Sequence, residues 1–173
     1  MNITVLYNTP DSDEPSDIDT QNSAVAVCDT LNKIPDFKAE LMGISKNEIA
    51  KIKNIKADFV FNLLEWTGHK TQYVVDALKL LDYQKIKYSG SHADGYALAN
   101  DKGRMKQMML DLKIPTPRFQ IYEKEFVFNE LKFPVIAKLA WEHCSLGLDE
   151  TNIVNDSDSL KSKILDLRSR FNM

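Results

Sequence analysis

Short apolar runs alternate with amphipathic helical patterns through the first 94 residues, and this alternation restricts the fold more than any other feature. The apolar runs predict strands at 3–7, 37–41, 59–63 and 87–89. Between them, helices are expected at about 20–32, 46–55 and around 74–81. Such alternation leads to right-handed crossovers and a parallel sheet with helices on both faces. The sequence therefore predicts an α/β fold with a doubly wound parallel sheet, centred on the runs 3–7 and 59–63.

The predicted helices have recognisable local signatures. Ser45 and Glu48 have the spacing of a capping box, which favours a short helix after them. Asp19 or Thr20 can cap the helix expected at about 20–32, and the acidic loop 9–19 is too polar to pack. The apolar residues that share one face are Ala24, Val27, Cys28 and Leu31 in the first helix, and Val74, Val75, Leu78 and Leu81 in the third.

A helical connector is expected at 95–113, followed by a second unit at 114–173. Asn100 and Asp101 can cap the connector helix, and its apolar residues are spaced to face a core: Met105, Met108, Met109 and Leu112. Two prolines then forbid helix continuation: Pro115 and Pro117. In the second unit, strands are predicted at 119–122, 135–138 and 152–154, a turn or short helix near 126–131, and a helix at 157–170. The elements after the connector make up only about half a domain.

Composition excludes several classes of function. The 22 basic residues are interspersed with 25 acidic ones and the formal net charge is -3, so no basic stripe is available for nucleic acid. Apolar runs never reach the roughly 18 residues that a membrane span needs, and no signal peptide precedes the first strand. We therefore expect a cytoplasmic protein with neither nucleic-acid nor membrane partners. Cys28 and Cys144 lack the spacing of a zinc site, and a disulfide between them is not expected.

Four short motifs follow one another in the middle of the chain: YSGS at 88–91, ANDK at 99–102, KIPTP at 113–117 and FPVIAK at 133–138. Each motif alone is weak, but four in this order are hard to obtain by chance. Their order and spacing resemble the ATP-grasp superfamily, and within it the D-alanine:D-alanine ligase-like branch. That family has stretches resembling YTGS, a DK helix, GIPTP and PVIVKP in the same order. The resemblance extends from about residue 58 to 155.

The resemblance implies a domain organisation and a reaction. Residues 1–94 correspond to a preATP-grasp, Rossmann-like substrate-side domain, and 114–173 to an incomplete α+β ATP-grasp subdomain. The implied function is an ATP-dependent carboxylate-amine ligase that works through an acyl phosphate, with ATP and Mg²⁺ as cofactors. Its substrate would be a small amino acid or peptide, as in peptidoglycan-like peptide synthesis, and a homodimer is compatible with the resemblance. The family's metal ligands and catalytic arginine lie outside these residues. We therefore expect the isolated chain to be inactive, and we expect none of its residues to bind the metal.

A phosphate site is implied around two lysines, Lys102 on the connector helix and Lys138 at a strand end, which we expect to converge on one cleft. The loop after Lys138, LAWEHCSLG at 139–147, lies where the family has a stretch resembling PSREGSSVG. The residues that coincide are Glu142, Ser145 and Gly147, which would form an amide cradle with a hydroxyl. The departures are Leu139, His143 and Cys144, which make the loop bulkier. The alternative is a pair of solvated lysines beside an ordinary turn with Trp141 buried against the sheet.

A substrate pocket is implied at 61–72, FNLLEWTGHKTQ, just past a parallel strand, where doubly wound folds bind ligands. The family has a segment there resembling FNLxEGxGG, and the matching residues are Asn62, Glu65 and Gly68. Trp66 replaces a glycine, and His69 and Lys70 replace a second glycine and a polar residue, so the pocket would be narrower or differently charged. Alternatively, Glu65 caps the next helix and Trp66 packs in the core.

A second class of function stays open beside the ligase. The departures in both loops favour a non-catalytic module, or a truncated relic, that keeps the fold and binds a nucleotide, small molecule or partner. The intact YSGS, DK and PVIAK elements favour the ligase, which is the preferred interpretation. The sequence that follows residue 173 would discriminate between them. An acidic residue and an asparagine a few positions apart would support a ligase, and an in-frame stop would support a relic.

Overall fold

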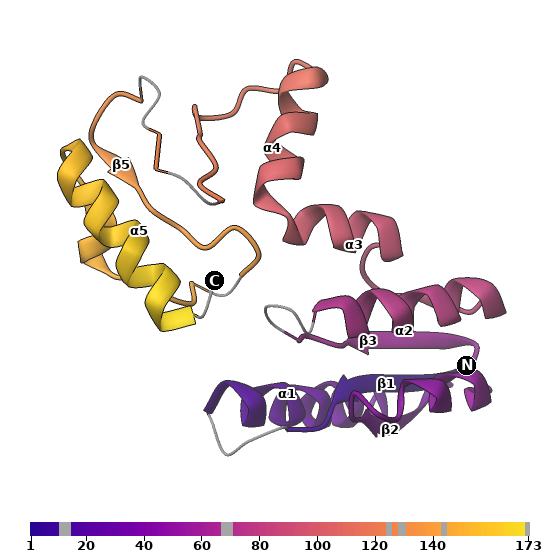
Figure 1. Cartoon of the computed structure of the whole chain (residues 1–173). Helices are drawn as coiled ribbons and strands as arrows, with labels where there is room; N and C mark the ends of the chain where they lie inside the picture. Colours follow the sequence, from indigo (N-terminus) through magenta and orange to yellow (C-terminus); the bar gives the residue numbers. More distant parts are fainter. Residues whose placement is uncertain (11–14, 67–70, 124–125, 128–130, 143–144, 172–173) are drawn as a thin grey trace. The chain divides into compact units, whose positions relative to one another are not determined.

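The structure is a computed structural model that describes residues 1–10, 15–66, 71–123, 126–127, 131–142 and 145–171. The chain divides into two compact units, Met1–Ala97 (unit 1) and Leu98–Met173 (unit 2), and each is described by itself. The helix α3 (Ala93–Asn100) spans the division (Figure 1). The boundaries expected from sequence, 1–94, 95–113 and 114–173, remain predictions about domain organisation.

Unit 1 is built on a four-stranded sheet in which every pairing is parallel (Figure 1). Its strands are β1 (Asn2–Asn8), β2 (Lys38–Ile44), β3 (Phe59–Leu63) and β4 (Lys87–Tyr88), in the spatial order β2-β1-β3-β4. The sheet confirms the predicted α/β class and the central position of β1 and β3.

Helices cover both faces of this sheet because successive residues of a strand point to opposite sides. On one face Val5 packs with Ala24 and Cys28 of α1 (Pro15–Leu31). On the other, Leu6 and Val60 pack with the 3₁₀ helix η1 (Ile49–Asn54) and with α2 (Thr71–Gln84). The predicted apolar face of α2 is confirmed, since its members are all buried: Val74, Val75, Leu78 and Leu81.

Two helix boundaries in unit 1 differ from the expectation. The first helix begins at Pro15, inside the segment that was expected to be loop, because proline is favoured in the first turn of a helix. The segment 46–55 forms only the short η1. Glu48 still accepts hydrogen bonds from the backbone N of Ser45 at 3.1 Å and from its Oγ at 3.0 Å, so part of the capping box is present.

The described residues of unit 2 beyond α3 form the α-helices α4 (Lys102–Asp111) and α5 (Ser157–Phe171) and a two-stranded antiparallel ladder. The strands are β5 (Val135–Ile136) and β6 (Ile153–Val154), which follows the 3₁₀ turn η3 (Glu150–Asn152). The buried core residues are Ala137, Leu139, Val154, Leu160 and Leu167. The helix predicted at 157–170 is confirmed.

The predicted strand at 119–122 is not formed. Residues 114–122 have no regular secondary structure, and the carbonyl oxygen of Tyr122 accepts a hydrogen bond from Arg168 Nη2 at 2.8 Å. That backbone group is therefore paired with a side chain of α5, and neighbouring strands of two residues offer little edge for a third strand. At 126–131, residues 126–127 and 131 are irregular, and 128–130 lie outside the described residues.

The expectation that the connector helix α4 faces a core is also wrong. Within α4 the buried residue is Gly103, whereas Met108 is 46% exposed, and Leu112, just beyond the helix, is 61% exposed. Local apolar spacing predicted the helix correctly, but it carries no information on whether a partner surface covers that face.

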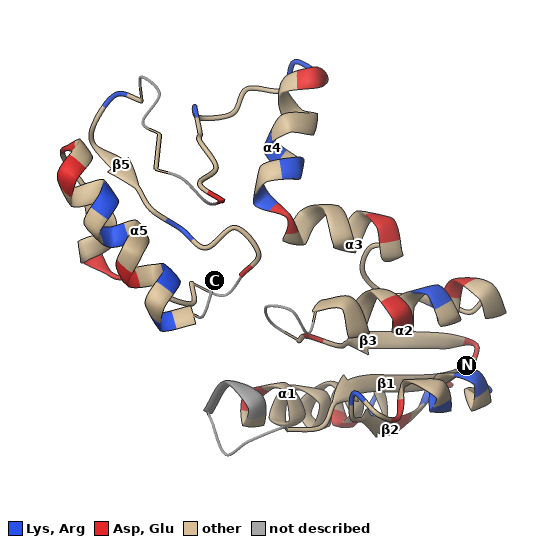
Figure 2. Ribbon diagram, viewed as in Figure 1, with Lys and Arg blue, Asp and Glu red and all other residues tan. Residues whose placement is uncertain are grey.

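Acidic and basic residues are interspersed along α2 and α5 (Figure 2). In the described part of the chain, no helix is both long and apolar enough to cross a membrane.

Candidate functional site

The N-terminus of α4 brings Lys102 to its position in unit 2. Asp101 is the N-cap, and its side chain accepts a hydrogen bond from the backbone N of Arg104 at 2.9 Å. This confirms Asp101 as a cap and satisfies one of the free amides of the first turn. Gly103 allows a close approach to Ile121, because an added Cβ would lie 2.3 Å from Ile121 Cδ1.

Lys102 is bound to the loop that follows Lys138. Its ammonium donates to the carbonyl oxygen of Leu139 at 3.0 Å and to that of Glu142, and its backbone N donates to the carbonyl oxygen of Ala140 at 3.1 Å. Three loop carbonyls thus meet the positive end of the α4 dipole. Burial lowers the pKa of Lys102, and the charge of Lys138 lowers it further, against an opposing contribution from Glu142.

Lys138 follows β5 and is exposed, as expected for a lysine at a strand end. The residue before it, Ala137, is buried, and Ile136 is 50% exposed. Because side chains alternate along an extended chain, Lys138 and Ile136 belong to the same, exposed face. Ile153, which pairs with Ile136 across the ladder, is 56% exposed on that face.

Ser145 and Gly147 both have left-handed backbone conformations, with φ of 59° and 69°. At Gly147 packing also favours glycine, since an added Cβ would lie 2.8 Å from Phe171 Cε2. His143 and Cys144 lie outside the described residues. Trp141 is 51% exposed, so the alternative in which it is buried against the sheet is wrong.

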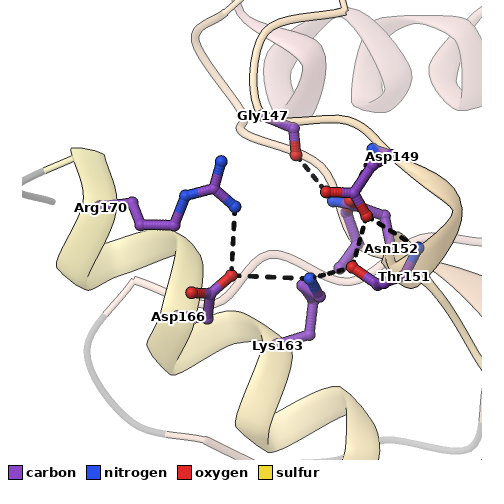
Figure 3. A network of polar contacts seen from close by, with 8 residues as sticks. Gly147, Asp149, Thr151, Asn152, Lys163, Asp166 and Arg170 are labelled. Atoms are coloured by element: carbon purple, nitrogen blue, oxygen red, sulfur yellow. Dashed lines mark hydrogen bonds and ion pairs between the residues drawn. The ribbon is translucent and has the colours of Figure 1, made fainter.

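Asn152 is a site residue that the sequence reading missed. It is fully buried, its Nδ2 donates to the carbonyl oxygens of Ala137 at 2.8 Å and Gly147 at 3.0 Å, and its Oδ1 accepts from the backbone N of Asp149 at 2.9 Å (Figure 3). The available signal was the spacing of Asp149 and Asn152, which form a capping box around η3.

The residues predicted to line a substrate pocket lie in unit 1. Asn62 Oδ1 accepts a hydrogen bond from the backbone N of Leu64 at 3.2 Å, and the exposed Glu65 donates its backbone N to Asn8 Oδ1 at 3.0 Å. Trp66 is 4% exposed and packs edge-on against Tyr73, so the alternative that it is a core residue is confirmed. Among the described residues, none accepts a hydrogen bond from its Nε1. Gly68 lies outside the described residues.

Acidic groups do not gather into a metal centre in the part of the chain that the structure describes: no group of three or more His, Cys, Asp or Glu residues there could hold a metal ion. The residues present therefore do not identify a Mg²⁺ site.

Comparison with known proteins identifies relatives of the whole arrangement. D-alanine–D-alanine ligase B of Pseudomonas putida is 30% identical over 154 residues, which are 87% of this chain and 46% of that protein. The crystal structure of D-alanine–D-alanine ligase from Bacillus anthracis matches with a TM-score of 0.75 at 20% identity, over 98% of this chain and 53% of that one. The structure of that ligase complexed with ATP matches with a TM-score of 0.67 at 23% identity, with the same coverage. No protein-family model matches.

A parallel α/β unit followed by part of an α+β unit is the architecture of the ATP-grasp class of proteins. Within that class the chain is a D-alanine:D-alanine ligase-like protein, which confirms the resemblance seen in its motifs. It spans about half the length of the relatives that it matches.

Proposed function

We propose that this chain is the N-terminal portion of an ATP-dependent carboxylate-amine ligase, in which unit 2 binds the phosphates of ATP through Lys102 and Lys138. The observation that carries the proposal is the position of Lys102, which the α4 N-terminus holds against the loop that follows Lys138. Burial lowers the pKa of Lys102, and the positive charge of Lys138 lowers it further. Two like charges held near each other are stabilised when an anion binds between them. A triphosphate is such an anion, and Glu142, Ser145 and Gly147 belong to the loop beside it.

The exposed face of the β5–β6 ladder supports a nucleotide rather than an isolated phosphate. Ile136 and Ile153 form an apolar pair in register, and Lys138 extends from the same face. A flat apolar surface next to an ammonium matches a ligand with a planar ring at one end and negative charge at the other. Stacking of the base on the isoleucines would leave its phosphates near the lysines.

The reaction that we propose phosphorylates a carboxylate with ATP, after which an amine displaces the phosphate. Negative charge increases on the β- and γ-phosphates during transfer, and fixed cations stabilise it. We assign the Mg²⁺ ligands to residues outside the 173 present, which by themselves are not proposed to turn over ATP. A small amino acid or peptide as the carboxylate, with Asn62, Glu65 and Gly68 near it, a cytoplasmic location and a homodimer remain proposals of the same kind.

A non-catalytic binding module is the second candidate, and one specific contact favours it. The ammonium of Lys102 already donates to the carbonyl oxygens of Leu139 and Glu142, so a phosphate would have to share or replace these bonds. The core position of Trp66, where the family has a glycine, favours the same candidate. Binding of ATP without any carboxylate-dependent chemistry in the complete gene product would identify this second function.

Substitution of Lys138 tests the proposed nucleotide site. We expect Lys138→Ala to weaken ATP binding by roughly 1.5–3 kcal/mol, the range for a hydrogen bond to a charged group. The measurement is isothermal titration calorimetry with ATP. Lys161→Ala is the matched control, because it removes an exposed lysine from α5 of the same unit. An equal loss of ATP affinity in both variants would mean that only the net charge matters. An unchanged affinity in Lys138→Ala would contradict the proposed site.

A further inference from the structure

The side chain of Asn152 extends the β5–β6 ladder by one residue. The ladder pairs Val135 with Val154 and Ile136 with Ile153, so the next pair is Ala137 opposite Asn152. Ala137 N donates to the carbonyl oxygen of Asn152 at 2.9 Å, as in a regular ladder. The backbone N of Asn152 cannot return the bond, because it donates to the carbonyl oxygen of Asp149 at 3.1 Å. Its Nδ2 takes that place and donates to the carbonyl oxygen of Ala137 at 2.8 Å.

Both backbone groups of Ala137 are therefore bound to Asn152, and Ala137 is the residue immediately before Lys138. Without this pairing Ala137 would lose both of its backbone hydrogen bonds, and the chain beyond it would be held by the bonds from Lys102 to the loop carbonyls. The direction in which Lys138 leaves the strand thus depends on a side chain that is 14 positions away (152 minus 138).

The same amide group also fixes the turn that contains Ser145 and Gly147. Nδ2 of Asn152 donates its second hydrogen to the carbonyl oxygen of Gly147 at 3.0 Å. Its Oδ1 accepts from Asp149 N at 2.9 Å, so both donor hydrogens and the acceptor are used. A fully satisfied amide in a buried position holds its partners rigidly, because an unpaired buried polar group would be costly.

We propose that Asn152 is a positioning residue of the phosphate site, which holds the strand end bearing Lys138 and the turn of Ser145 and Gly147 in one arrangement. This inference rests on the proposed function, because a bound nucleotide would be the common ligand of the two lysines and the turn. Asn152 touches no ligand itself and acts through backbone carbonyls.

The polar contacts on the α5 side of η3 contribute less to this arrangement. Lys163 Nζ donates to Thr151 Oγ1 at 2.5 Å and forms an ion pair with Asp166 Oδ2 at 3.5 Å (Figure 3). Arg170 Nη1 lies 3.4 Å from the same Oδ2. Asp166 and Arg170 are exposed at this pair, and exposed ion pairs are weak. The test is therefore made at Asn152.

The test compares two asparagines that have the same kind of contact in different units. Asn32 Nδ2 donates to the carbonyl oxygen of Ala39 at 3.0 Å, and its Oδ1 accepts from Ala39 N at 2.8 Å, so it pairs with strand β2 of unit 1. Asn152→Leu and Asn32→Leu each remove such a side-chain amide with little change in size. Both are made in the 173-residue chain.

Two properties are measured in each variant. The pKa of Lys102 is obtained without ligand from ¹³C NMR of labelled lysine side chains, with Lys102→Met to assign the signal. The affinity for inorganic tripolyphosphate is obtained by calorimetry. In Asn152→Leu we expect the pKa of Lys102 to rise toward its ordinary value, because Lys138 and the covering loop are no longer held. We also expect the affinity to fall about tenfold, by analogy with the lower end of the loss seen when a residue that orients a metal ligand is removed. Asn32→Leu is expected to change neither property.

A folded Asn152→Leu variant with an unchanged Lys102 pKa would overturn the positioning role. If amide spectra show that this variant loses the fold of unit 2, Asn152→Gln is used, because it keeps the NH₂ group on a longer side chain. It is expected to give intermediate values, and wild-type values there would also overturn the role. If wild-type protein binds no tripolyphosphate while the Lys102 pKa still depends on Asn152, the proposed nucleotide function fails and the positioning role stands.

Discussion

Different kinds of contact stabilise the interior of each unit. In unit 1 the seven-residue β1 is paired along its length with β2, and thirteen buried residues form the larger apolar cluster among the described residues of that unit. In the described part of unit 2, each strand of the ladder has two residues and the cluster has five buried residues. Unit 2 has in addition hydrogen bonds from single side chains to carbonyl oxygens far away in sequence, such as those from Lys102 to Leu139 and from Asn152 to Ala137. A sheet domain can therefore be stabilised by burial, while a binding loop depends on a few directed contacts.

Leucine truncations in the two cores give the largest expected effect. Leu6→Ala in unit 1 removes a side chain that is 0% exposed, and Leu160→Ala in unit 2 removes one that is 3% exposed. Such cavities cost about 2–5 kcal/mol, and we expect Leu6→Ala at the upper end because more apolar neighbours surround it. Unfolding of each unit can be followed by the indole NMR signal of its tryptophan, Trp66 or Trp141. Equal losses at the two positions would contradict the difference in core packing.

Periodicity explains how much of unit 1 could be predicted from sequence. The apolar runs and the spacing of residues such as Val74 and Leu78 are local signals, and they gave the element order and the central strands. What local signals could not give is a boundary set by one residue, such as Pro15 at the start of α1.

Unit 2 was predicted less well because its contacts join residues that are far apart in sequence. The strand expected at 119–122 is absent since the carbonyl of Tyr122 is bound by Arg168, 46 positions later. Lys102 and Lys138 were found as candidate site residues through the order of the motifs. Nothing local to Asn152 indicated that its side chain would take a strand position, although the capping-box spacing with Asp149 was visible.

Each unit contains a glycine with a left-handed backbone conformation, and the two glycines differ in their surroundings. Gly90 in unit 1 has φ of 95° with no atom within 4 Å of an added Cβ, whereas Gly147 in unit 2 has φ of 69° and would clash with Phe171. We expect Gly90→Ala to cost only the backbone term, roughly 1–2 kcal/mol. Gly147→Ala should cost more by about 1–3 kcal/mol of overpacking. Denaturant unfolding of each unit measures both values, and similar costs would mean that Phe171 moves aside freely.

The smallest expected effect concerns two exposed capping carboxylates, one in each unit. Glu48 accepts hydrogen bonds from Lys51 and Ser45, which lower its pKa to about 2. Asp149 accepts from the side chain and the backbone N of Thr151, at 2.8 Å for the latter, and these bonds lower its pKa as well. Carboxylates in unfolded chains titrate near pH 4, at about 4.3 for Glu and about 3.9 for Asp.

Because both pKa values are lower in the folded state, each carboxylate stabilises its unit above the unfolded pKa, and this stabilisation is lost as the pH falls through the folded pKa. Glu48→Gln should therefore make the stability of unit 1 less dependent on pH between about 4.3 and 2, with no change in unit 2. Asp149→Asn should do the same for unit 2 alone, starting below about pH 3.9. Acid titrations followed through the Trp66 and Trp141 indole signals separate the two units. If either substitution altered both signals equally, the units would unfold as one body, and the contrast between a sheet stabilised by burial and a loop held by directed bonds would not extend to their unfolding.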